Sequence, residues 1–253
     1  MSSETDYSSD YYAESSEYLN TKAEDEVITA DIFEYQKLNE GNVVERMWKI
    51  NVDWLYEVRN EFKSGMYVFQ QAIEILNHYL QKVVVDKSQL QKVALTAYSI
   101  ADKNDSDVNA AHIDDLVWVC AKAYSKQEFV DCELDILEKL DYHINYVTLL
   151  DYKDYYGEVE MWDDPTFQFL LDVTAMSVDM YKYSAFVRLL SLEHFYYQML
   201  NKPTPITSGE VFECVEVLED SIRKLKGTKS AMIDYYNKTK FIDVAIRVFN
   251  KVS

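Results

Sequence analysis

The chain has 253 residues and a formal charge of −19, because 44 Asp and Glu outnumber 25 Lys and Arg. Such an acidic surface repels nucleic-acid phosphates and anionic lipid, which argues against both as partners. Only 5 Gly and 3 Pro are present, so the turn residues needed for hairpins and phosphate-binding loops are scarce and an all-α fold is expected.

The first segment of the chain differs in composition from the rest. Residues 1–26 carry eight acidic groups and one Lys, with Ser and Tyr between them and almost no aliphatic side chains. A segment of this kind buries too little apolar surface to offset its chain entropy. The composition therefore predicts a disordered acidic tail over residues 1–26.

From residue 29 onward, apolar residues recur at spacings of three and four, which is typical of helices. Helices are expected at residues 29–38, 43–63, 66–82, 86–103, 112–121, 126–141, 146–158, 165–181, 183–201, 207–225 and 228–237. The pattern weakens near residue 145. We expect two modules of about five helices each, over residues 27–145 and 146–253, with a short helix at the start of the first.

The segment over residues 43–63 has two apolar stripes where an ordinary surface helix has one. The first stripe is expected to face the core and consists of Val44, Trp48, Leu55, Val58 and Phe62. The second consists of Met47, Ile50 and Trp54 and ends beside Glu57. Two explanations stay open: either this is the central helix of a bundle, or its second stripe forms a groove for a peptide carrying a basic residue and a Leu.

Several motifs, taken in order, resemble those of the cyclins, above all the A- and B-type mitotic cyclins. The run Met47–Val58 is similar to the cyclin-box signature M-R-A-I-L-V-D-W-L-x-E-V, and Ser88–Ala97 is similar to K-L-Q-L-V-G-x-x-A. Ala101–Lys103 stands where that family has A-S-K. Asp31–Tyr35 resembles the helix that precedes the box, and Tyr235–Val244 resembles the closing K-Y-x-x-S-K-Y-x-x-V.

The resemblance implies two stacked five-helix cyclin folds and a regulatory subunit with no active site of its own. Its partner would be a cyclin-dependent protein kinase, which it binds next to a mobile regulatory helix and activates. The kinase-binding residues implied are Ile32, Tyr35, Lys103, Glu133, Leu137, Tyr142 and Ile144. The residues implied for a groove that recruits substrates or inhibitors with a basic-x-Leu motif are Met47, Ile50, Trp54, Glu57, Leu90 and Gln91.

The chain also departs from that family. Trp48 and Asn77 replace an Arg and an Asp that pair inside the first fold, and losing both together is a compensated exchange because neither charge is left unpaired. Asn51 replaces a Leu of the groove, which should weaken peptide docking.

Other classes of function fit the sequence less well. A nucleic-acid-binding scaffold of the transcription machinery would need a basic surface and a zinc ribbon. A helical enzyme would need a catalytic or metal-binding constellation, but the four His and three Cys are scattered, so we expect no metal, no cofactor and reduced, buried thiols. A divergent or viral cyclin that binds a host kinase with little activation stays open. No apolar run or signal segment is evident, so the protein is expected in the nucleus, the cytoplasm or both.

Overall fold

All regular secondary structure in the described residues of the computed structural model is helical. The structure describes residues 17–28, 31–105, 110–153, 155, 159–204, 208–238 and 242–252. The first part of the chain forms a helix over residues 17–25. The helices of the first half are then α2 (Ile32–Leu38), α3 (Glu45–Phe62), α4 (Met66–Lys82), α5 (Leu90–Asp105), α6 (Ile113–Val119) and α7 (Lys126–Lys139). Those of the second half are α8 (Val159–Asp163), α9 (Pro165–Ala175), α10 (Ala185–Met199), α11 (Gly209–Leu225), α12 (Ala231–Lys238) and α13 (Ile242–Lys251), with 3-10 turns η1 (Leu149–Tyr152) and η2 (Val178–Lys182).

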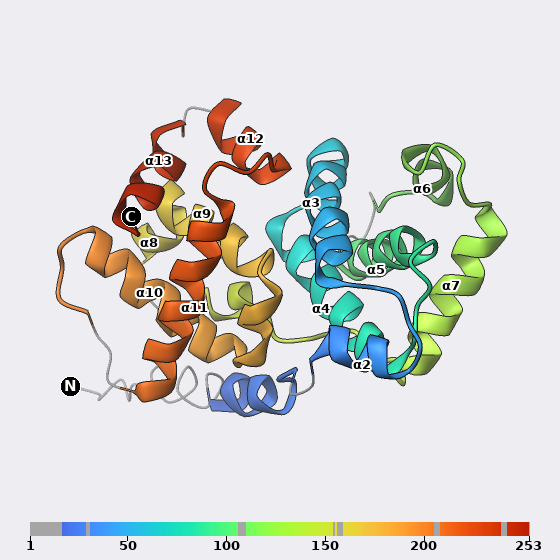
Figure 1. Cartoon of the computed structure of the whole chain (residues 1–253), viewed down its shortest axis with the longest axis horizontal. Helices are drawn as coiled ribbons and strands as arrows, with labels where there is room; N and C mark the ends of the chain where they lie inside the picture. Colours follow the sequence, from blue (N-terminus) through green and yellow to red (C-terminus); the bar gives the residue numbers. More distant parts are fainter. Residues whose placement is uncertain are drawn as a thin grey trace, which may run out of the picture.

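The helices gather into two bundles that lie side by side, α3–α7 on the right and α8–α13 on the left of Figure 1. In the first bundle α5 packs against α3, α4 and α7. It is buried on nearly every side from Val93 to Asp102, as expected for a helix that is apolar all round. The central helix of this bundle is therefore α5, whereas α3 keeps Ile50 58% exposed.

The second bundle is built around α9, which packs against α10, α11 and α13. Asp164 caps α9 by accepting a hydrogen bond from the backbone N–H of Thr166, and Pro165 opens the helix at a position where its missing N–H costs nothing. Phe167, Phe169 and the aliphatic residues between α9 and its neighbours fill this core. α12 leaves the bundle to pack on α3, which joins the two halves (Figure 1).

Polar contacts also hold the bundles together. Arg188 of α10 and Glu74 of α4 form a buried ion pair at 2.7 Å. Asp172 of α9 accepts hydrogen bonds from the hydroxyl groups of Tyr56 at 2.6 Å and Tyr236 at 3.0 Å. Burial raises the pKa of Asp172 to about 6, despite the opposing effects of Arg59 and of these two hydrogen bonds.

Three predictions about the elements were wrong in part. Residues 17–25 are helical, although the composition predicted disorder to residue 26; residues 1–16 lie outside the described part of the chain. The range 146–158 holds only the short turn η1 among its described residues, and α8 begins after it; the single helix expected over 165–181 is broken into α9 and η2. α13 was missed, although Val244, Ala245, Val248 and Val252 are buried at helical spacing.

The chain passes from one bundle to the other through residues 140–148, which include the predicted boundary near residue 145. α7 ends because Asp141 and Tyr142 have left-handed backbone conformations, with φ of 52° and 58°. The segment after them runs past α4 and reaches η1 of the second bundle. We call residues 141–148 the linker.

Candidate functional site

An exposed ion pair joins α5 and α7 of the first bundle. The ammonium group of Lys103 donates to both carboxylate oxygens of Glu133, at 2.7 and 2.6 Å. Lys103 lies in the last turn of α5, where its charge interacts favourably with the helix dipole. The two side chains are 47% and 29% exposed, so both can still meet a partner from solvent.

The outer face of α7 carries an apolar stripe around this pair. Phe129, Cys132 and Ile136 point into the core, as one stripe of an amphipathic helix should. A second stripe faces outward and consists of Val130, Leu134 and Leu137, with Leu134 51% exposed and Val130 47% exposed. The sequence analysis named Leu137 and missed Val130 and Leu134. A search of residues 126–141 for a second apolar stripe, as was made for residues 43–63, would have found them.

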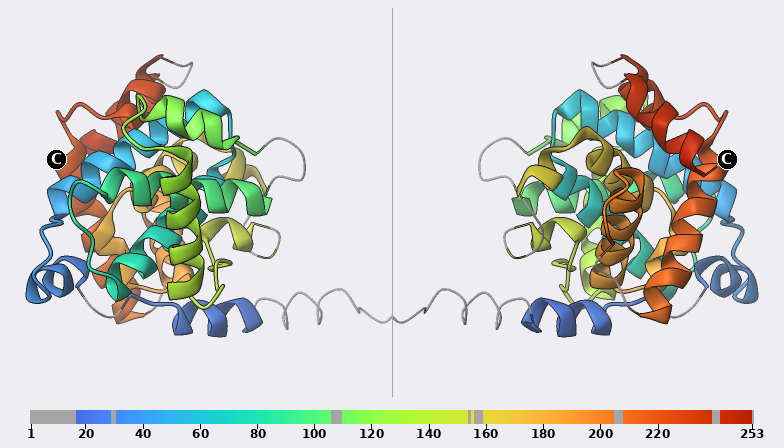
Figure 2. Two further views of the ribbon diagram at one scale, coloured as in Figure 1. Left: turned by 90° about the vertical axis from the view of Figure 1, so that its right-hand side faces the viewer. Right: turned by 90° about the vertical axis from the view of Figure 1, so that its left-hand side faces the viewer.

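α7 begins with a capping box. Ser125 accepts a hydrogen bond from the backbone N–H of Glu128, whose carboxylate accepts one from the backbone N–H of Ser125. This capping box fixes where α7 begins and hence which residues occupy its outer face. The left-hand view of Figure 2 looks onto this side of the molecule, with α7 in front of α5.

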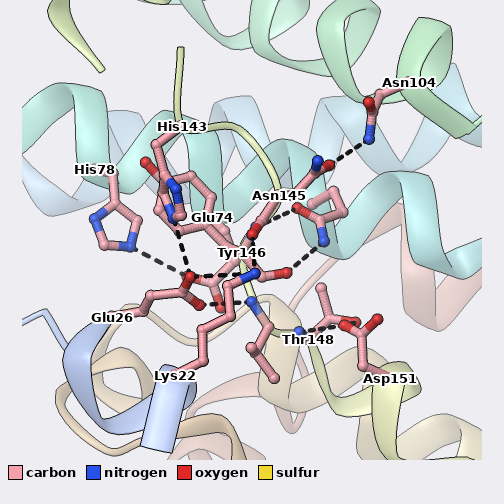
Figure 3. Close-up of polar contacts among 12 residues, drawn as sticks. Lys22, Glu26, Glu74, His78, Asn104, His143, Asn145, Tyr146, Thr148 and Asp151 are labelled. Carbon is pink, nitrogen blue, oxygen red and sulfur yellow. Dashed lines mark hydrogen bonds and ion pairs between the residues drawn. The ribbon is translucent and has the colours of Figure 1, made fainter. Parts of the chain in front are cut away.

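The linker that follows α7 is held from three directions (Figure 3). From the helix over residues 17–25, Lys22 donates to the carbonyl oxygen of Asn145 at 2.6 Å. From α5, the side-chain amide of Asn104 donates to the side chain of Asn145 at 2.5 Å. From α4, Gln71 donates to the carbonyl oxygen of Tyr146 at 2.5 Å.

Glu26, directly after that first helix, makes two further contacts with the linker. One carboxylate oxygen lies 3.0 Å from the ring of His143, and the other accepts a hydrogen bond from the backbone N–H of Val147 at 2.6 Å. At the same place the ring of His78 stacks on the ring of Tyr146, with 4.0 Å between their centroids. Burial lowers the pKa of His78 to about 4, so this ring is neutral near pH 7.

This network fixes the backbone on which two predicted kinase-binding residues lie. Tyr142 is 63% exposed, and Ile144 is partly buried against the core. Sequence reasoning did not find the contribution of Lys22 and Glu26, because it placed both residues in a disordered tail. No local pattern signals these contacts, since Glu26 bonds to residues more than a hundred positions away.

The other predicted kinase-binding residues are on α2, and the structure corrects one of them. Ile32 is only 2% exposed and packs into the core, so it contributes no surface. Tyr35 is partly exposed, and its hydroxyl group donates to the carbonyl oxygen of Lys82 at 2.9 Å.

The predicted docking groove lies along α3 and the start of α5. Ile50 is 58% exposed, Met47 and Trp54 are half-buried against the core, and Glu57 is exposed. Gln91 is partly exposed as well.

One predicted groove residue differs from the expectation. Leu90 is 1% exposed and belongs to the core, which is a second correction to the predicted site. Asn51 uses its amide within its own helix, donating to the carbonyl oxygen of Met47 at 2.9 Å. In the first stripe of this helix, Val44 is 48% exposed and therefore not a core residue as predicted.

The two exchanged residues of the first bundle contact each other, as the interpretation of a compensated exchange requires. The indole N–H of Trp48 donates to the side-chain oxygen of Asn77 at 2.8 Å, and neither residue is exposed. A neutral hydrogen bond thus joins α3 to α4 at this position.

Cys120, Cys132 and Cys214 are free and buried, as predicted, and burial raises the pKa of the Cys214 thiol to about 11. Among the described residues, no group of three or more His, Cys, Asp and Glu side chains could hold a metal ion. Over the same residues, no helix has the length and the apolar character needed to cross a membrane.

Comparison with known proteins identifies the family of this chain. The model of the cyclin N-terminal domain matches residues 14–145, which include the first bundle and the helix over residues 17–25. The chain belongs to the cyclin family.

Several relatives carry cyclin names. A putative cyclin-A3-1 of Arabidopsis thaliana is 26% identical over 243 residues, which cover 87% of this chain and 67% of that protein. The rice cyclin-A3-2 is 26% identical and 65% covered, so the chain spans about two thirds of the length of these plant relatives. The human G2/mitotic-specific cyclin-B3 is 30% identical over 144 residues, 57% of this chain and 10% of that protein. A crystal structure of a viral cyclin from herpesvirus saimiri covers 92% of this chain and 94% of its own, at 17% identity and a TM-score of 0.46.

Members of this family are regulatory subunits, and they generally partner with cyclin-dependent kinases. The A- and B-type relatives support a regulatory role in the cell cycle.

Proposed function

We propose that the chain is a non-catalytic regulatory subunit that binds a cyclin-dependent protein kinase and activates it. The observation that carries this proposal is the exposed pair of Lys103 and Glu133, with the outward stripe of α7 beside it. A charged pair that keeps part of its hydrogen-bonding capacity, next to the exposed apolar side chains of Val130 and Leu134, has the composition of a protein interface. Tyr142 and Ile144 on the linker, and Tyr35 on α2, would extend this surface.

The activation would be a shift of population in the kinase. An isolated kinase holds its regulatory helix outward, so the Lys–Glu pair that orients the ATP phosphates is broken. A subunit that binds the inward arrangement more tightly by about 5 kcal/mol converts a mostly inactive population into a mostly active one. The rigid anchoring of the linker suits this role, because a surface that is ordered before binding loses less entropy when it binds.

We further propose that Met47, Ile50, Trp54, Glu57 and Gln91 recruit substrates or inhibitors with a basic-x-Leu motif. Ile50 and Trp54 offer apolar surface for the Leu, and the carboxylate of Glu57 suits the basic residue. Asn51 leaves this groove less apolar than in the family pattern. A subunit of this kind acts where its kinase is, so the proposal places the chain in the nucleus, the cytoplasm or both.

The first test measures binding and activation together. The full chain is mixed with each member of a panel of purified cyclin-dependent kinases, and both the affinity and the phosphorylation of a short peptide are measured. Replacing Lys103 and Glu133 together by Ala should abolish co-purification of the kinase and leave the helicity of the chain unchanged.

A second pair of variants separates the proposed surface from general damage. Leu134→Asp on α7 should weaken kinase binding on the order of thirtyfold. Ile246→Asp on α13 is a matched control, because Ile246 is 52% exposed and Leu134 is 51% exposed. Full binding by both the double Ala variant and Leu134→Asp would refute the surface. Tight binding without activation would instead support the divergent cyclin that binds a kinase with little activation.

A further inference from the structure

A pocket of about 250 Å³ lies at the junction of the two bundles. α3 forms one wall, and the other is formed by α9 with the residues that follow it, by α11 and by residues 228–230. Its apolar lining includes Ile50, Val173, Met176 and Leu225. Of the proposed groove residues only Ile50 lines it, so the junction pocket and the groove lie on neighbouring faces of α3.

Four cationic side chains surround this pocket, although the chain as a whole carries a charge of −19. Arg46 and Lys49 come from α3, and Lys224 and Lys229 come from the second bundle. All four are exposed.

The two carboxylates at the pocket are already engaged. Asp53 accepts hydrogen bonds from the hydroxyl of Ser230 at 2.7 Å and the backbone N–H of Ala231 at 2.9 Å, at the start of α12. Asp179 lies 3.1 Å from the ammonium group of Lys182 and 3.7 Å from that of Lys224.

The four cations differ in whether a carboxylate lies beside them. Lys49 pairs with Glu45, and Lys224 pairs with Asp220 at 2.7 Å. Arg46 and Lys229, on opposite walls, pair with no carboxylate within the part of the chain that the structure describes. The pocket therefore presents two cations without a carboxylate partner among the described residues, one on each side of an apolar floor, whereas the hydrogen bonds to Asp53 come from neutral groups.

We propose that the junction pocket binds an acidic peptide segment of a partner protein. A Leu of that segment would lie against Ile50 and Leu225, with flanking carboxylates beside Arg46 and Lys229. Acidic peptides are repelled by most of this surface, so a local positive field confers selectivity for this place. The proposal does not rest on kinase binding, and its ligand has the opposite charge to the basic-x-Leu motif proposed for the groove.

The test uses the full chain and two labelled peptides in fluorescence anisotropy. The probe is Gly-Asp-Glu-Leu-Asp-Glu-Gly, and its control is Gly-Lys-Lys-Leu-Lys-Lys-Gly. We expect the acidic peptide to bind in a salt-dependent manner and the basic control not to compete with it. Absence of binding by the acidic peptide, or equal competition by the basic one, would overturn the proposal.

Charge-reversing variants locate the bound peptide. Arg46→Glu combined with Lys229→Glu should weaken binding about tenfold, as expected for two exposed charge contacts. Lys226→Glu, three residues before Lys229 but outside the pocket lining, is the control for a single charge reversal and should bind like the parent. If the reversed variant loses helicity, Arg46→Gln with Lys229→Gln replaces it and should still lower the affinity.

Unchanged affinity in the folded double variant would place the peptide elsewhere and refute the assignment. In a last measurement, the same peptide is tested on a chain that lacks residues 1–16, which are themselves acidic. Binding seen only after that removal would mean that the chain's own segment occupies the pocket, which also overturns the proposal.

Discussion

The buried contact between Trp48 and Asn77 gives the sharpest test of how the first bundle is held together. Trp48 is 0% exposed, Asn77 is 0% exposed, and a hydrogen bond of 2.8 Å joins α3 to α4. The cyclin pattern has Arg and Asp at these two positions. Trp48→Arg alone would bury a cation without a counter-charge, and Asn77→Asp alone would bury an anion; each should lower the free energy of unfolding by about 3–5 kcal/mol.

The double variant should be less destabilised than the sum of its parts, because the two new charges neutralise each other in the same place. A coupling free energy of about 3 kcal/mol is expected, since the contact is direct and shielded from water. Urea unfolding of the parent, both single variants and the double variant, followed by circular dichroism, gives the cycle. Additive losses in the double variant would refute the reasoning, because they would mean that the two positions do not compensate each other.

Three further predictions concern other parts of the molecule. Burial raises the pKa of Asp172 to about 6 from an ordinary 3.8, so its contribution to the stability of the folded state is fully present below about pH 4 and is lost as the pH rises through 6. Asp172→Asn should remove that loss, and in urea titrations the variant should gain up to about 3 kcal/mol of stability relative to the parent between pH 4 and 7. A stability difference between variant and parent that stays unchanged across that range would contradict this prediction. Glu26→Ala should speed amide exchange at Val147 and weaken kinase binding while α4 stays protected, and unchanged exchange would show that Glu26 does not hold the linker. Trp54→Ala should lower phosphorylation of substrates with a basic-x-Leu motif and spare a short peptide without one, whereas equal loss on both would make Trp54 a structural residue.

The helical content could be read from the sequence because it depends on local features. Few Gly and Pro residues and apolar spacings of three and four fix where helices can form. Caps then fix where some begin, as Ser125 and Glu128 do for α7. α3 and α4 accordingly lie within a residue or two of their expected bounds.

The helix over residues 17–25 could not be predicted in this way. Its composition is acidic and poor in aliphatic side chains, so by itself it has little reason to fold. It packs Ala23 into the core and bonds to the linker through Lys22 and Glu26, and these contacts exist only once the rest of the chain is in place.

The candidate site, too, could be predicted from the sequence only in part. The resemblance to cyclins was the only reason to assign Lys103 and Glu133 to the same surface, and in the structure they are in direct contact. The resemblance could not tell that Ile32 and Leu90 are buried, because a residue on an apolar face points either inward or to a partner at the same helical spacing.

The sequence alone determined the helical class, most helix positions and the family pattern, because all three depend on residues that are close together in the chain. Only the tertiary structure decided which apolar stripe of each helix meets solvent, how the linker is held, and that four cations gather where the bundles meet. The physical reason is that burial and electric field depend on residues far apart in the chain, and their proximity is set by packing.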